Sequence, residues 1–261
     1  MKSAWLALSL LFVAACGGSE TVLVAAGTTL VDSGFIEAVA DDFVSQTGID
    51  VDVLGEATAQ VLALARSGSV DVTITHAPDL EAEFEADGLA SRSETVFSSR
   101  LLIAGPPDTV LTARDAVGAF REIAALGGPF VGREDGSGTA IVEAGIWAAA
   151  GIDGPDQEWY LSTGQGMGLT LQVASERSAF VLAELGTFLS IERLDLVDRG
   201  IRDPMLDNPY RAMSVAATDS IGAVRFVDWL VSEDGRAAIE RANREVFGRS
   251  DVYSPGGPGA P

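Results

Sequence analysis

The order of apolar runs and helical patterns is the feature of this sequence that most constrains its fold. Val22 to Ala26 is a compact apolar run typical of a buried strand, and the residues after Gly27-Thr28-Thr29 repeat at helical spacing until Gly48. Val51 and Val53 then alternate with acidic residues, as in a half-exposed strand. Because strand, loop and helix follow one another, the sequence predicts parallel βαβ units and an α/β fold.

The same order continues through the rest of the chain. Further helices are predicted at residues 60–67, 115–126 and 221–231, and further strands at residues 70–75, 101–104, 130–131, 179–183, 194–197 and 212–216. Gly105-Pro106-Pro107 breaks both patterns and is a predicted crossing point between two lobes. The strand at 212–216 is predicted to return the chain to the first lobe.

Composition excludes several classes of protein. The chain has 38 Asp and Glu against 17 Lys and Arg, which gives a formal net charge of −21, and 47% of its residues are apolar, so we expect a folded chain. The deficit of Lys and Arg excludes nucleic-acid binding and a basic membrane patch. One histidine, His76, and one cysteine, Cys16, are too few for a zinc site or an internal disulfide, so no metal and no cofactor are expected.

The first residues are similar to a bacterial lipoprotein signal. Lys2 precedes the apolar run Ala4 to Val13, which is too short to span a bilayer, and Ala14-Ala15-Cys16 follows directly. On this interpretation residues 1–15 are the signal peptide, Cys16 is lipidated, and residues 16–21 are a tether. A plain secretory signal is the alternative. The lipoprotein interpretation places the protein on the periplasmic or extracellular face of a membrane, held only by its acyl chains.

Three loops place small polar groups next to helix starts. Gly27-Thr28-Thr29 offers hydroxyls and N–H groups at the edge where open α/β sheets bind ligands, although an ordinary capping turn explains it equally well. In the loop 133–139, the Arg133 fork, two hydroxyls and the N–H groups freed by two glycines suit an oxyanion. The alternative there is a capped loop in which Arg133 pairs with Asp135. The glycines of Thr163 to Gly168 are a weaker signal for close approach to a ligand.

A hydrolase is the remote alternative to a binding protein. Ser137 stands in Gly-Ser-Gly, but the spacing differs from a nucleophile elbow, and only His76 offers an imidazole base. His76 is more typical of a structural residue at the end of a strand. We therefore expect no enzymatic activity.

The chain resembles the tungstate-binding proteins of bacterial ABC importers over nearly the whole of its mature length. The block Thr163 to Gly168 is the most distinctive match. The other matching segments are Thr28-Thr29, Asp32-Ser33-Gly34, Val70-Asp71-Val72 leading to His76-Ala77, Arg133 to Thr139, Trp159-Tyr160, Gly186-Thr187, Asn208-Pro209-Tyr210 and Asp228-Trp229-Leu230.

The resemblance implies the two-lobed periplasmic-binding-protein fold of type II, in which each lobe is a sheet flanked by helices and the ligand lies in a cleft between the lobes. We expect lobe 1 at residues 22–104 and 211–250, lobe 2 at residues 105–210, and a disordered tail at residues 251–261. The implied function is capture of a tetrahedral oxyanion, tungstate or molybdate, by a monomer that delivers it to an ABC transporter permease.

The resemblance also implies which residues hold the ligand: Thr28, Thr29, Thr58, Arg133, Ser137, Gly138, Thr139 and Gly166. Fewer hydroxyls are present here than the family pattern has in its first two loops. The loop 133–139 is also similar to that of phosphate-binding proteins of the same fold, so phosphate is the alternative ligand. Hydrogen phosphate keeps a proton and rewards a carboxylate acceptor, whereas tungstate and molybdate require only donors. Asp135 is either that acceptor or the residue that holds Arg133 in place.

Overall fold

The structure is a computed structural model that describes residues 20–257. The predicted signal peptide, Cys16 and residues 258–261 lie outside the described residues. No helix within residues 20–257 has the length and apolar character needed to cross a bilayer.

The described chain alternates strands and helices, as expected. The strands are β1 Thr21–Gly27, β2 Asp50–Glu56, β3 Val72–Thr75, β4 Ala90–Gly105, β5 Phe130–Gly132, β6 Tyr160–Ser162, β7 Val181–Glu184, β8 Val197–Asp198, β9 Asp207–Val215 and β10 Ser254–Pro255. The α-helices are α1 Thr28–Asp32, α2 Phe35–Thr47, α3 Thr58–Arg66, α4 Pro78–Ala86, α5 Ala116–Leu126, α6 Gly138–Ala150, α7 Met167–Glu176, α8 Leu185–Ser190, α9 Ile221–Leu230 and α10 Glu233–Phe247. Two short 3₁₀ helices, η1 and η2, lie at Pro204–Leu206 and Ala216–Thr218.

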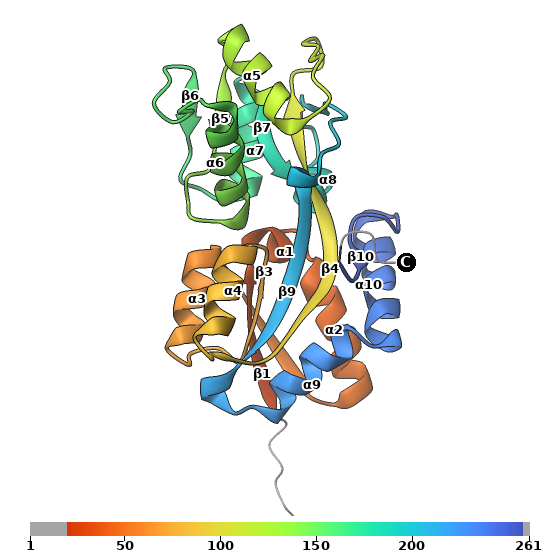
Figure 1. Ribbon diagram of the computed structural model, residues 1–261. Helices are drawn as coiled ribbons and strands as arrows, with labels where there is room; N and C mark the ends of the chain where they lie inside the picture. The colour runs from red at the N-terminus through yellow and green to blue at the C-terminus, as the bar shows by residue number, and fades with distance from the viewer. Residues whose placement is uncertain (1–19, 258–261) are drawn as a thin grey trace, which may run out of the picture.

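Two lobes are joined by the long strands β4 and β9 (Figure 1). In the first lobe, β1 pairs in parallel with β2 and β3, and β9 joins β3 and β4 by antiparallel pairing. In the second lobe, β7 and β8 pair with the end of β4, and β5 pairs in parallel with β6. The two-lobed α/β fold predicted from the sequence is confirmed.

Strand β4 belongs to both lobes. It pairs with β9 as far as Arg100 and with β7 from Leu101 onward. The sequence predicted a strand only for the apolar residues 101–104, because residues 90–99 are mostly polar and only partly buried. We therefore place the crossing between the lobes inside β4 rather than at Gly105.

Each lobe has its own aromatic cluster. In the first lobe, Phe35 stacks on Tyr253 with ring centroids 4.0 Å apart and meets Phe97 edge to face. In the second lobe, Phe120 and Phe130 pack against Trp147 at 4.3 and 5.1 Å.

The predicted disorder of residues 251–261 is wrong for the part that the structure describes. Val252 and Tyr253 are fully buried, and β10 pairs with β4. The Gly and Pro content of the tail suggested disorder, but one apolar and one aromatic side chain are enough to dock it onto the first lobe.

Candidate functional site

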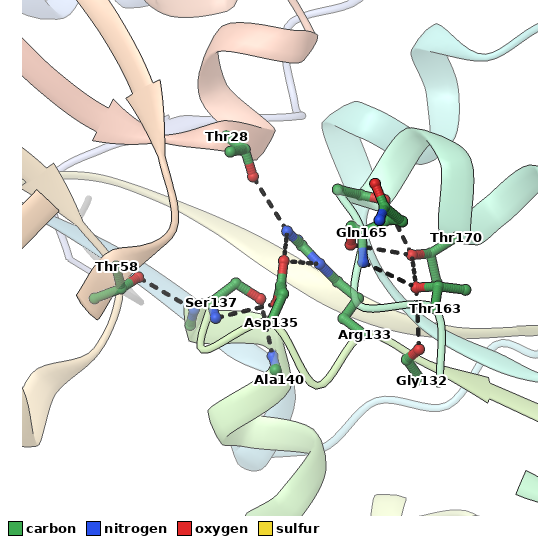
Figure 2. A network of polar contacts seen from close by, with 12 residues as sticks. Thr28, Thr58, Gly132, Arg133, Asp135, Ser137, Ala140, Thr163, Gln165 and Thr170 are labelled. Atoms are coloured by element: carbon green, nitrogen blue, oxygen red, sulfur yellow. Dashed lines mark hydrogen bonds and ion pairs between the residues drawn. The ribbon is translucent and has the colours of Figure 1, made fainter. Parts of the chain in front are cut away.

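Arg133 occupies the contact between the two lobes. It follows β5, and its side chain is only 1% exposed. Its Nε and Nη2 donate to Oδ2 of Asp135 at 3.0 and 2.5 Å, and Nη2 also donates to Oγ1 of Thr28 in the other lobe at 3.2 Å (Figure 2). A buried guanidinium is stable only when paired, so Asp135 keeps the cation in this place. Nη1 of Arg133 is buried and has no hydrogen-bond partner within the described residues.

The loop 163–168 fixes the backbone of Arg133. The N–H of Gly164 donates to the carbonyl of Arg133 at 2.9 Å, and the N–H of Thr163 donates to the carbonyl of Gly132 at 3.0 Å. The hydroxyls of Thr163 and Thr170 lie 2.8 Å apart and stabilise this loop (Figure 2). The most distinctive block of the sequence therefore positions the arginine.

The start of α6 forms the second part of the site. Ser137 caps the helix, because its Oγ accepts from the N–H of Ala140 at 3.3 Å, and its own N–H donates to Oδ1 of Asp135 at 3.1 Å. The N–H of Gly138 donates across the lobes to Oγ1 of Thr58 at 3.1 Å. The hydroxyl of Thr139 is buried without a partner in the described chain.

Gly166 lies at the start of α7, and its carbonyl accepts from the hydroxyl of Thr170 at 3.0 Å. No side chain caps α7, so no capping side chain accepts a hydrogen bond from the first N–H groups of this helix. A Cβ on Gly166 would lie 3.7 Å from Oδ2 of Asp32 on α1, which places the glycine at the contact between the lobes. Helix α3, which begins at Thr58, also lacks a side-chain cap.

Behind Thr29 lies a group of buried polar residues. Oγ1 of Thr29 is 3.3 Å from Oη of Tyr210, and the amide of Asn208 donates to that same Oη at 3.0 Å. His76 packs beside Tyr210 with ring centroids 5.0 Å apart. A Cβ on Gly138 would lie 2.5 Å from Cε1 of His76, so the imidazole lies directly against the start of α6.

The electrostatics of the site favour neutral and cationic donors. The pKa of His76 is lowered to about 4, mainly by burial; a contact with Asn208 opposes this, and the nearby charge of Arg133 contributes to it. His76 is therefore neutral at ordinary pH. Burial raises the pKa of Asp32, and Arg133 partly offsets that rise. Among residues 20–257 no group of three His, Cys, Asp or Glu side chains is arranged to hold a metal ion.

The structure brings most of the predicted residues together. Thr28 and Thr58 of the first lobe contact Arg133 and Gly138 of the second. Thr29 follows Thr28 on α1, and Ser137 and Thr139 flank Gly138 at the start of α6. Asn208 and Tyr210 were recognised only as part of a matching segment, without a role. Their contribution depends on β9 lying beside α1, and nothing in the local sequence indicates that contact.

The arrangement offers hydrogen-bond donors to an anion. Guanidinium and backbone N–H groups from two lobes converge, and the hydroxyl oxygen of Ser137 accepts a helix-capping hydrogen bond. Two lobes joined by crossing strands around such a site are the architecture of a solute-binding protein.

Comparison with known proteins gives the family. The PBP superfamily domain matches residues 14–234. The chain is 30% identical over 248 residues to the tungstate-binding protein TupA of Peptoclostridium acidaminophilum, covering 90% of this chain and 85% of that protein. The chain belongs to the PBP superfamily and, within it, to the family of the tungstate-binding proteins. The resemblance identified from the sequence is confirmed.

Solved structures agree with this assignment. The tungstate ABC transporter structure from Geobacter sulfurreducens has a TM-score of 0.76 at 32% identity and covers 85% of this chain and 98% of its own. TupA from Desulfovibrio alaskensis G20 has a TM-score of 0.75 at 26% identity and covers 92% and 100%. A phosphate-binding protein from Clostridium perfringens, at 15% identity with a TM-score of 0.63, shares the fold alone. The family consists of transport proteins, so the chain is not an enzyme and the hydrolase alternative is discarded.

Proposed function

We propose that this protein captures a tetrahedral oxyanion, tungstate or molybdate, between its lobes and delivers it to the permease of an ABC importer. The buried Arg133, donating to Thr28 across the lobes, is the observation that carries the proposal. An anion bound there receives donors from both lobes and so stabilises the closed arrangement over the open one. The names of the relatives in the same family support tungstate as the ligand.

The hydrogen bonds of Asp135 favour tungstate over phosphate. Its Oδ2 accepts from Nε and Nη2 of Arg133, and its Oδ1 accepts from the N–H of Ser137. Both carboxylate oxygens are thus engaged within their own loop. Asp135 holds Arg133 in place, and the guanidinium and the backbone N–H groups near it can only donate to a ligand. A fully deprotonated dianion suits such a site better than hydrogen phosphate, which must place its proton on an acceptor.

A thermal-shift screen tests the ligand class. The chain from Glu20 onward is heated with tungstate, molybdate, sulfate or phosphate at equal concentration. Tungstate and molybdate should raise the melting temperature most, because a ligand that binds only the folded state stabilises it by mass action. A larger shift with phosphate would replace the assignment by the phosphate alternative, and no shift with any oxyanion would exclude an oxyanion-binding role.

Delivery at a membrane is the second part of the proposal. A lipid on Cys16 would keep the protein outside the cytoplasm, within reach of its permease, as a tethered monomer. The full chain and its Cys16→Ser variant should separate on cell fractionation, the first in the membrane fraction and the second in the soluble extracytoplasmic fraction. If both are found in the soluble fraction, the anchor is refuted and the signal is a plain secretory one.

A further inference from the structure

We propose that Asn208 and Tyr210 hold the Thr29 hydroxyl as a hydrogen-bond donor, so that the site rejects oxyanions that carry a proton. Asn208 and Tyr210 would then be positioning residues that set specificity from behind the site. The proposal rests on the proposed function, because Thr29 must face the bound anion for its hydroxyl to matter.

The three residues form a buried relay across two elements. Asn208 and Tyr210 lie on β9, one of the two strands that cross between the lobes, and Thr29 lies on α1. Their exposed fractions are 2%, 0% and 1%, so bulk solvent does not reach them. Asn208 Nδ2 donates to Tyr210 Oη at 3.0 Å, and Tyr210 Oη lies 3.3 Å from Thr29 Oγ1.

Counting hydrogens sets the direction of the relay. A phenol carries one hydrogen, and Asn208 already donates to the phenol oxygen, so Tyr210 has only Thr29 Oγ1 within hydrogen-bond reach among the described residues. Burial raises the pKa of Tyr210 well above its ordinary range, so the phenol keeps that hydrogen. If Thr29 donated to Tyr210 instead, the buried phenol hydrogen would have no acceptor, which is costly.

His76 packs beside this relay, with its ring centroid 5.0 Å from that of Tyr210, and its side chain is buried. The relay itself runs from Asn208 through Tyr210 to Thr29, with each group donating to the next.

This direction separates the two classes of dianion. A tungstate oxygen accepts the hydroxyl hydrogen of Thr29, and every hydrogen in the relay then has an acceptor. A hydrogen phosphate that donates its proton to Thr29 takes the second lone pair of Oγ1, because Tyr210 occupies the first. The Thr29 hydrogen must then turn away from both partners, where no described residue lies within hydrogen-bond reach, and it is left buried and unpaired. One such loss corresponds to about a tenfold to a hundredfold difference in affinity.

Asn208→Asp tests the relay by giving the phenol an acceptor. Tyr210 can then donate to the carboxylate, Thr29 can donate to Tyr210, and a protonated ligand leaves no hydrogen unpaired. Affinities for tungstate and phosphate are measured by calorimetry and by competition, at a pH above the second ionisation of phosphoric acid. Both ligands are then dianions, so the added carboxylate weakens both alike and the ratio of the two affinities reports the relay.

The expected result is that Asn208→Asp lowers the tungstate-to-phosphate affinity ratio by about tenfold or more. The double variant Asn208→Asp with Tyr210→Phe keeps the carboxylate but removes the phenol, and it should restore the ratio. An unchanged ratio in Asn208→Asp, or a double variant that stays as low as the single one, would overturn the proposal. Wild-type protein that fails to bind tungstate would instead refute the proposed function, so the two failures are distinguishable.

Tyr210→Phe alone supplies a test that adds no charge. Without the phenol donor the Thr29 hydroxyl is no longer held toward the ligand, so tungstate binding should weaken by about threefold to tenfold. Tyr253→Phe, which removes another buried phenol from the same aromatic cluster, should leave tungstate affinity unchanged. Tighter tungstate binding in Tyr210→Phe would mean that the relay runs in the opposite direction and would also overturn the proposal.

Discussion

Replacement of Arg133 by alanine is the perturbation with the largest expected effect on ligand binding. The guanidinium is 1% exposed and makes two hydrogen bonds to Asp135 and one to Thr28. Its loss removes the one cation in these contacts and leaves Asp135 with only the N–H of Ser137 to stabilise its charge. Truncating one partner of a buried, hydrogen-bonded charge pair between binding partners typically costs about 2–5 kcal/mol of binding free energy, which is a loss of roughly thirtyfold to several thousandfold in affinity.

Calorimetric titration with tungstate measures this effect. Arg244→Ala is the matched control, because it also removes one positive charge but from a side chain that is 54% exposed and paired only at 3.8 Å. An exposed pair of this kind contributes about 0–1 kcal/mol, so the control should bind as wild type does. The melting temperature of each ligand-free variant shows whether a change reflects folding. If Arg133→Ala is folded and binds tungstate within about threefold of wild type, the guanidinium does not hold the anion and the site is misplaced.

Three further predictions follow from buried contacts. Gly138→Ala would place a Cβ 2.5 Å from His76 Cε1, which prevents the start of α6 from lying against the imidazole. Tungstate affinity, measured by titration, should therefore fall by more than about tenfold. Affinity equal to that of the wild type would show that closure does not need this contact. Burial raises the pKa of Glu143 from 4.5 to about 7. Ionisation of this carboxyl therefore destabilises the folded state, by an amount that grows as the pH rises from 4.5 to about 7. Glu143→Gln should therefore raise the free energy of unfolding in urea by about 1–3 kcal/mol above pH 7 and not at pH 4.5, and an equal effect at both would contradict this. Tyr253→Ala should cost about 3–5 kcal/mol of stability in the same assay, because the ring is fully buried against Phe35; a cost below about 1 kcal/mol would mean that the tail is not docked.

The sequence predicted the parts of the fold that depend on local pattern. The apolar run of β1, the helix that ends at Gly48 and the helix that follows Asp115 are all present near the predicted bounds. Asp115 caps α5 by accepting from the N–H of Gly118, which is a contact three residues along the chain. Such features are set by neighbours in sequence, so periodicity and capping residues are enough to find them.

The features that the sequence missed depend on distant contacts. The first half of β4 is polar and was not predicted as a strand. It is a strand because it pairs with β9, and its own residue pattern does not indicate this. Tyr253 is ordered because it stacks on Phe35, which lies more than two hundred residues earlier in the chain.

In the candidate site too, the sequence predicted features set by neighbouring residues and missed those set by distant contacts. The Arg133 loop was found because a guanidinium, two hydroxyls and two glycines lie within seven residues. The sequence leaves open whether Asp135 faces the ligand or Arg133, and the two hydrogen bonds that its Oδ2 accepts from Arg133 favour the second role. The roles of Asn208 and Tyr210 depend on the packing of β9 against α1 and could not be read from their own neighbourhood.

The central claim is that a donor-only site between the lobes captures a fully deprotonated dianion. Calorimetric titration of the ligand-free chain with tungstate and then with phosphate, in the same buffer, tests it most directly. We expect one tungstate per chain, bound at least about a hundredfold more tightly than phosphate, because a protonated ligand leaves a buried hydrogen unpaired. Phosphate binding as tight as tungstate binding would contradict the account.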